Sequence, residues 1–260
     1  MIPERIVPGT AEWELFEVEH RQRYEFFAPH CKGLRILDLA CGTGYGSRLL
    51  AQLGAASVTG VDISAEALEC ARTHFAHPAV EFVQCDAANI RTLGKQFDAA
   101  VSFETIEHLA NPEMLLREVQ GLLRPGAFFV CSTPNRDFER KSSTPNPYHL
   151  CEWTYGEFDS AFARYFEIEG RFHQSPSPAY VRHLQLLSEL EGIQKKMRFS
   201  VAFRIEEKVR RALGKEALNG HHLAQSLWKI TPGDYVIEPI VQPSPRHVAF
   251  IMAGRARPHV

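Results

Sequence analysis

The chain has 260 residues, 45% of them hydrophobic and 23% charged, with a formal net charge of -2. This composition is typical of a globular protein and excludes a disordered chain, and the length fits one large domain or one domain with a sizeable insertion. Because the net charge is close to zero, it gives no general attraction to nucleic acid or to an anionic membrane.

Compartment and membrane class follow from the cysteines and the apolar runs. The six cysteines form no CxxC pair, which predicts reduced, structural thiols. The first twenty residues carry charges throughout, and no stretch approaches the roughly 18 apolar residues that a membrane span needs. We therefore expect no integral membrane segment and a cytoplasmic protein.

The first element is predicted at residues 11 to 29, within an N-terminal helical segment of residues 1 to 32. Aromatic and histidine side chains recur there at steps of three and four, the period of an amphipathic helix. These residues are Trp13, Phe16, His20, Tyr24 and Phe27.

Short apolar runs then alternate with helical patterns from residue 34 to residue 133. Such alternation predicts βαβ units and a parallel sheet with right-handed crossovers. The predicted fold class is α/β, a Rossmann-like, seven-stranded, mostly parallel sheet with helices on both faces. Its core is expected at residues 33 to 172, and the apolar run at 165 to 172 is one of its later strands.

Local signals mark several element boundaries. Ser64 is placed to cap one helix, and Pro112 is placed to start another. Arg124, Pro125 and Gly126 predict a helix stop and a turn. Thr154 and Glu157 have the spacing of a capping box, and the polar segment 134 to 150 before them is expected to be a loop over the carboxyl end of the sheet.

A helical insertion is predicted near the C-terminus, at residues 173 to 245, before a final strand at 246 to 260. Basic residues outnumber acids in its amphipathic stretch, residues 187 to 215. A solvated helix face explains this pattern, and the alternative is an electropositive lid over a phosphorylated or nucleotide-linked acceptor.

The strongest motif is the strand and glycine-rich turn at residues 36 to 46, ILDLACGTGYG. Glycines let the backbone approach a ligand, and the following helix presents free N–H groups to a carboxylate. Ser47 stands where a dinucleotide fingerprint needs its third glycine, which counts against NAD. Two further strands end in Asp62 and Asp86. Acids at successive strand ends predict a nucleoside site.

These motifs, with FDAAVSFETIEHL, LLRPGAFFVCSTPN and NPYHLCEWT, resemble the class I S-adenosylmethionine-dependent methyltransferases, from about Gly33 to Phe158. The resemblance implies that S-adenosylmethionine binds and that S-adenosylhomocysteine is the product. It places Asp38, Gly42 and Gly44 at the methionine part, Asp62 at the ribose and Asp86 with Ala87 at the adenine. Phe103 would line the sulfonium end, and Ala40, Tyr45 and Ile63 complete the implied cofactor set.

The N-terminal motifs ERIVPGT and EHRQRYEFFAP are similar to those of bacterial methyltransferases of O-antigen and other glycan synthesis. In that case the first helix closes over the cofactor and Arg23 meets a carboxylate. An ordinary surface arginine and a packed tyrosine are the alternative.

The chemistry depends on Glu104-Thr105-Ile106-Glu107-His108, after the fourth strand. If this segment forms a helical turn, Glu104, Glu107 and His108 share one face. With His149 from the later loop they suit a divalent metal such as Mg, Mn or Zn, which would activate an acceptor hydroxyl. The segment is similar to the metal site of small-RNA 2′-O-methyltransferases and to ubiquinone-pathway O-methyltransferases. The alternatives are His108 alone as the catalytic base beside Glu104, and carboxylates that only bond backbone.

The first functional hypothesis is O-methylation of a sugar, glycan or other hydroxylated small molecule, with or without a metal. The alternatives are a metal-free N- or C-methyltransferase and a non-catalytic S-adenosylmethionine-binding regulator. Nucleic acid is not expected as a partner, because the chain is slightly acidic and carries no RNA-binding module that we recognise. The acceptor can be anionic or nucleotide-linked, and a homodimer is one candidate oligomeric state.

Overall fold

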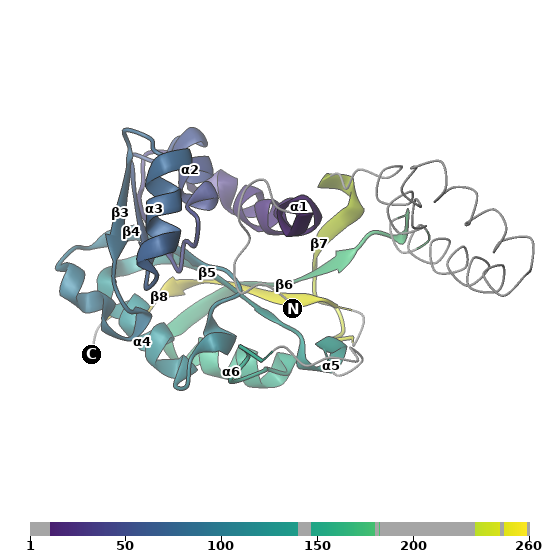
Figure 1. Cartoon of the computed structure of the whole chain (residues 1–260). Coiled ribbons are helices and arrows are strands. Elements are labelled where there is room, and N and C mark those ends of the chain that lie inside the picture. Colours follow the sequence, from purple (N-terminus) through teal and green to yellow (C-terminus); the bar gives the residue numbers. More distant parts are fainter. Residues whose placement is uncertain (1–10, 140–146, 180–181, 183–231, 245–246, 259–260) are drawn as a thin grey trace, which may run out of the picture. The chain divides into compact units, whose positions relative to one another are not determined.

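A computed structural model describes residues 11 to 139, 147 to 179, 182, 232 to 244 and 247 to 258 (Figure 1). The chain divides into two compact units, Met1–Ser175 with Ile237–Val260, and Pro176–Val236. The predicted basic helix at 187 to 215 lies outside the described residues. Within the described part of the chain, no helix is both long enough and apolar enough to cross a membrane.

One eight-stranded sheet has the order β3-β2-β1-β4-β5-β8-β6-β7. Strands β1 to β5 pair in parallel, and β8 pairs antiparallel with both β5 and β6. The predicted α/β class with a mostly parallel sheet is therefore confirmed. The strands are β1 Arg35–Leu39, β2 Ser57–Asp62, β3 Val80–Gln84, β4 Phe97–Ser102, β5 Leu123–Pro134, β6 Phe166–Pro176, β7 Tyr235–Pro239 and β8 Ala249–Ala256.

The predicted number of seven strands is wrong, because β7 adds an eighth at the sheet edge. It falls inside the segment that was predicted as a helical insertion. The strand has only five residues, ends in Pro239 and follows the short helical turn Pro232–Asp234. A run this short, bounded by prolines, has too few residues for alternation to distinguish a strand from a loop.

Helices cover both faces of the sheet. Figure 1 places α1, α2 and α3 on one side of it and α4 and α6 on the other. The α-helices are α1 Ala11–Phe27, α2 Tyr45–Gln52, α3 Ala65–His74, α4 Pro112–Leu122, α5 Arg136–Glu139 and α6 Tyr155–Tyr165. The described residues also form four short 3-10 helices: η1 Ala28–His30, η2 Ala87–Leu93, η3 Ile106–His108 and η4 Pro232–Asp234.

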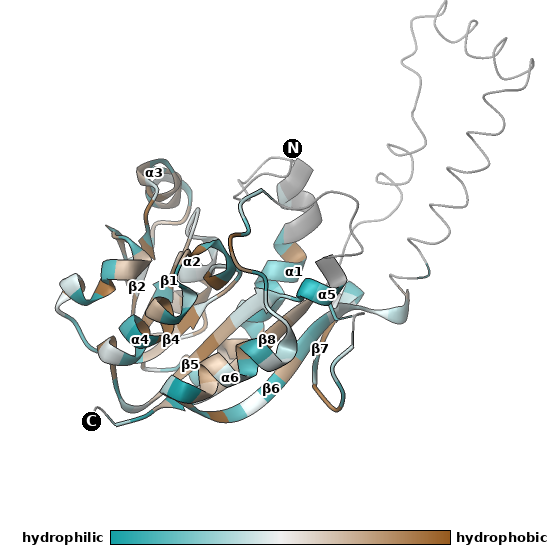
Figure 2. Ribbon diagram, turned by 90° about the horizontal axis from the view of Figure 1, so that it is seen from below, coloured by the Kyte–Doolittle hydropathy of each residue, from teal (hydrophilic) through white to brown (hydrophobic). Residues whose placement is uncertain are grey.

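Two hydrophobic clusters follow from this layering, and β1 contributes to both. Ile36 packs with residues of α1 and α2, whereas Leu37 and Leu39 pack with residues of α4 and α6. Alternate residues of a strand point to opposite faces, so the central strands are apolar on both sides. Figure 2 shows the resulting hydrophobic colour along β5 and the hydrophilic colour of the short helix α5.

Most boundary predictions are confirmed by the capping geometry. Ser64 Oγ accepts a hydrogen bond from the backbone N of Ala67, Pro112 begins α4, and Thr154 with Glu157 forms a capping box. Helix α4 ends at Leu122, just before the predicted helix stop. The Arg124–Gly126 turn is instead part of β5, where the register against β4 shifts.

Candidate functional site

A cavity of about 300 Å³ lies where strands β1, β2, β3 and β4 end. The carboxyl ends of parallel strands are the usual ligand site of open α/β sheets. Ten of the residues predicted from the sequence line it: Ala40, Gly42, Tyr45, Asp62, Ile63, Asp86, Ala87, Phe103, Glu104 and His108.

Two of the strand-end acids face this cavity with their orientation fixed by backbone donors. Asp62 accepts hydrogen bonds from the backbone N of Gly42 and of Ser64, both at 2.9 Å. Asp86 accepts one from Ala88 N at 2.8 Å. Because these bonds hold both carboxylates before any ligand arrives, they are preorganised acceptors for ligand hydroxyl or amino groups.

The glycine turn shapes the cavity through close packing. Gly44 has φ +85°, and a Cβ there would lie 2.6 Å from the Cβ of Ala71. A Cβ on Gly46 would lie 2.0 Å from the ring of Tyr24, so this glycine is what lets α1 pack against α2. Gly44 is not part of the cavity wall and acts by shaping the turn.

Asp38 stands behind the turn and does not line the cavity. It is 1% exposed, and its carboxylate accepts hydrogen bonds from Tyr24 Oη at 3.1 Å and Ser47 Oγ at 2.6 Å. Burial raises the pKa of Asp38 to about 6, and these two hydrogen bonds partly oppose that effect. Ser47, which replaces the third fingerprint glycine, therefore helps to position a buried acid.

The segment from Glu104 to His108 does not form the single helical turn that was predicted. Glu104 has φ +49°, and only Ile106–His108 is helical, as η3. The expectation that Glu104, Glu107 and His108 share one helix face is therefore wrong. A residue in the left-handed region cannot continue a right-handed turn, so the direction of its side chain is set separately.

Three of the four predicted metal ligands still come together. One ligand atom from each of Glu107, His108 and His149 lies within 4.8 Å of the others. The backbone carbonyl of Glu107 accepts hydrogen bonds from Leu150 N at 2.8 Å and Cys151 N at 2.9 Å. These two bonds tie the loop that carries His149 to the turn that carries His108.

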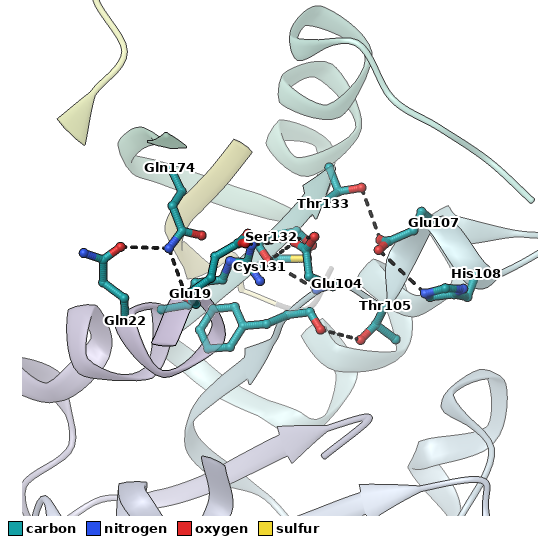
Figure 3. A network of polar contacts seen from close by, with 12 residues as sticks. Glu19, Gln22, Glu104, Thr105, Glu107, His108, Cys131, Ser132, Thr133 and Gln174 are labelled. Carbon is teal, nitrogen blue, oxygen red and sulfur yellow. Dashed lines mark hydrogen bonds and ion pairs between the residues drawn. The ribbon is translucent and has the colours of Figure 1, made fainter. Parts of the chain in front are cut away.

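The protonation chemistry of this group is dominated by burial. Glu107 is fully buried, and burial raises its pKa well above the ordinary range, with a further rise from the charge of Glu104. Burial, and then His108, lower the pKa of His149. Figure 3 shows Glu107 between Thr133, whose hydroxyl donates to it at 3.2 Å, and His108, whose Nε2 lies 3.8 Å away.

Glu104 is the fourth predicted metal ligand, and it lies outside this group. Its Oε1 accepts a hydrogen bond from Ser132 Oγ at 2.6 Å, and its Oε2 is 3.7 Å from Nη2 of Arg23. Its carboxylate contacts β5 and α1, so its assignment as a metal ligand stays a prediction.

Similarity to known proteins identifies the family. The "Probable S-adenosylmethionine-dependent methyltransferase" of Mycolicibacterium smegmatis is 34% identical over 176 residues, which cover 65% of this chain and 67% of that protein. A family model described as a methyltransferase domain matches residues 37 to 131. The chain belongs to the class I S-adenosylmethionine-dependent methyltransferases.

Other methyltransferases match in part or in fold. The "Ubiquinone biosynthesis O-methyltransferase" of Ruegeria pomeroyi is 39% identical over 107 residues, 40% of this chain and 43% of that one. The crystal structure of N-methyltransferase NodS from Bradyrhizobium japonicum, in complex with S-adenosyl-L-homocysteine, has a TM-score of 0.58 at 11% identity. It covers 97% of this chain and 93% of that one, a similarity that shows the shared fold.

Helix α1 gives this methyltransferase two wall residues that were not in the predicted cofactor-binding set. His20 and Tyr24 line the cavity, and burial, with the charge of Arg23, lowers the pKa of His20 well below its ordinary value. Both belong to the N-terminal motif EHRQRYEFFAP, for which the first helix was predicted to close over the cofactor. Arg23 is fully buried and does not line the cavity, and its Nη2 donates a hydrogen bond to Glu19 Oε1 at 2.6 Å.

Proposed function

We propose that this enzyme methylates a hydroxyl group of a sugar, a glycan or another hydroxylated metabolite. The observation that carries the proposal is the placement of His108, whose side chain lines the same cavity as Asp62 and Asp86. Methyl transfer from a sulfonium to a hydroxyl needs a positioned base at the transfer point.

The contacts of His108 fit the role of base. Its Nδ1 is 3.0 Å from the backbone carbonyl oxygen of Tyr148. A carbonyl oxygen can only accept, so Nδ1 carries the proton in the neutral ring and Nε2 presents its lone pair. In this proposal Nε2 takes the proton of the acceptor hydroxyl as the methyl group is transferred.

The cofactor would occupy the wall built by β1, β2 and β3. Asp62 binds the ribose hydroxyls, Asp86 and Ala87 read the adenine, and Phe103 lines the sulfonium end. Gly42 and the first turn of α2 lie at the methionine part, with Asp38 acting through Tyr24 and Ser47 behind them. This places the methyl group on the side of the cavity that Glu104 and His108 line.

Glu107, His108 and His149 fit a divalent cation, and we extend the proposal to one. Glu107 Oε1 is buried with no hydrogen-bond partner among the described residues, and it faces His108 Nε2. Two imidazoles and one carboxylate are a common donor set for Zn²⁺ and other divalent ions. When bound, such an ion would take the Nε2 lone pair of His108 and, in place of a histidine base, would lower the pKa of an acceptor hydroxyl.

For the segment between β6 and β8 we propose an acceptor lid. The support is its excess of basic residues, which suits an anionic or nucleotide-linked acceptor. Neutralising Arg210 and Arg211 together is expected to raise the KM for a UDP-linked sugar without changing the Kd for S-adenosylhomocysteine. An unchanged KM would assign the basic residues to an ordinary solvated surface.

The test of the main proposal is a methyl-transfer assay on UDP-hexoses, hexose phosphates and hydroxybenzoates, with an equal panel of amines. We expect transfer to a hydroxyl, and loss of the rate in chelator with recovery on adding Mg²⁺, Mn²⁺ or Zn²⁺. Full activity in chelator would rule out the proposed metal and would leave His108 as the base. Transfer to amines alone would contradict O-methylation.

A further inference from the structure

Glu104 has an unusual backbone for its residue type. It is one of two non-glycine residues with positive φ among those the structure describes, and its φ is +49°. This region is sparsely populated by residues that carry a Cβ, and such residues persist where the surroundings hold them in place. The surroundings of Glu104 therefore identify what selects its conformation.

Ser132, at the end of β5, holds Glu104 from two sides (Figure 3). Its Oγ accepts a hydrogen bond from the backbone N of Glu104 at 3.2 Å and donates one to Glu104 Oε1 at 2.6 Å. Ser132 is fully buried, so water does not compete for either bond. One hydroxyl thus fixes both the backbone and the carboxylate of the same residue.

Glu104 is also a wall residue of the cavity. Glu104 lines the cavity, its side chain is 18% exposed, and the fully buried guanidinium of Arg23 lies 3.7 Å behind Oε2. Glu104 also lies outside the compact group of Glu107, His108 and His149. The cavity therefore has two separate places that accept a hydrogen bond, one at His108 Nε2 and one at Glu104.

We propose that Ser132 is a positioning residue that holds Glu104 ready to bind a second hydroxyl of the acceptor, while His108 serves the hydroxyl that is methylated. This assignment rests on the proposed O-methylation and narrows its substrate to molecules with two nearby hydroxyls. The second hydroxyl donates to the Glu104 carboxylate and undergoes no reaction, so it orients the first for in-line transfer.

The first test compares Ser132→Ala with Ser132→Thr and with the control Ser102→Ala. Ser102 lies beside Cys131 on the neighbouring strand β4, is fully buried, and its hydroxyl makes no hydrogen bond to another described residue. Ser132→Ala is expected to raise the acceptor KM roughly tenfold, as for a lost hydrogen bond to a charged group. The Kd for S-adenosylhomocysteine should not change, and Ser132→Thr should restore the KM.

An equal KM effect in Ser102→Ala would mean that any lost buried hydroxyl disturbs the site, and would overturn the role of Ser132. A weakened Kd for S-adenosylhomocysteine in Glu104→Gln would assign Glu104 to the cofactor and would also overturn it. Glu104→Gln provides this measurement even if the Ser132 variants fail to fold, because it leaves β5 unaltered.

The second test uses the panel sugar that the wild type methylates, together with its single-deoxy analogues. One analogue is expected to lose roughly tenfold in kcat/KM with the wild type and to lose little with Glu104→Gln. If every analogue that keeps the methylated hydroxyl reacts as fast as the parent, the second hydroxyl is not recognised and the inference fails while O-methylation stands. Absence of transfer to any hydroxyl would overturn both.

Discussion

The two sides of the cavity are built by different means. The side to which we assign the cofactor, called the cofactor side, consists of turns that follow β1, β2 and β3, where Asp62 and Asp86 are held by backbone N–H groups at most twenty residues away in sequence. The acceptor side joins distant segments: Glu104 to Ser132, 28 residues apart, and His108 to Tyr148, 40 residues apart. Short sequence motifs therefore predict the residue contacts of the cofactor side well and those of the acceptor side poorly.

The electrostatics of the two sides also differ. On the cofactor side, Asp62 and Asp86 are bonded to backbone donors, and only Asp38 is fully surrounded by protein. On the acceptor side, burial dominates, since it raises the pKa of Glu107 and lowers that of His149. Groups whose ordinary protonation is shifted by burial are typical of sites that move protons.

The largest expected effect is on the acceptor side. His108→Ala should lower kcat by a factor on the order of 10² to 10⁴, the usual contribution of a general base, while the Kd for S-adenosylhomocysteine stays within about twofold. Single-turnover methyl transfer and titration calorimetry measure the two quantities. If His108→Ala weakened cofactor binding and left kcat unchanged, the division of the cavity into two sides would be wrong.

The next effect concerns the buried acid behind the cofactor side. Because burial raises the pKa of folded Asp38 to about 6, its contribution to stability is complete below about pH 4 and is lost as the pH rises through 6. Relative to Asp38→Asn, the wild type should lose about 2 kcal/mol between pH 4 and pH 6, and about 3 kcal/mol over the whole titration. Urea unfolding of both proteins at four pH values tests this. A difference independent of pH would mean that Asp38 is not perturbed.

The smallest expected effect is on cofactor affinity. Asp62→Ala should weaken binding of S-adenosylhomocysteine by about 1.5 to 3 kcal/mol, roughly tenfold or more, because it removes charge-assisted hydrogen bonds to the ribose. Titration calorimetry measures the change, and NAD should not bind to either protein. Since Asp62 also fixes Gly42 N, Asp62→Asn is a control that keeps an acceptor oxygen. If Asp62→Ala left the affinity for S-adenosylhomocysteine unchanged, the assignment of Asp62 to the ribose would be wrong.

The sequence was sufficient for elements whose signals are local. Ser64 and Thr154 cap helices as predicted, since a cap depends on residues within one turn. The alternation of strands and helices gave the sheet class, and ten predicted residues line one cavity because strand ends converge. The eighth strand was missed because β7 is too short to carry a periodic signal.

What the sequence determined by itself is therefore the methyltransferase fold and the strand-end residues to which we assign the cofactor, because both follow from hydrophobic period and from residues close along the chain. Only the tertiary structure determined how the side chains on the acceptor side are arranged. It placed Glu104 in a left-handed conformation held by Ser132, and outside the group of Glu107, His108 and His149. These outcomes depend on contacts between distant buried side chains, which no spacing in the sequence records.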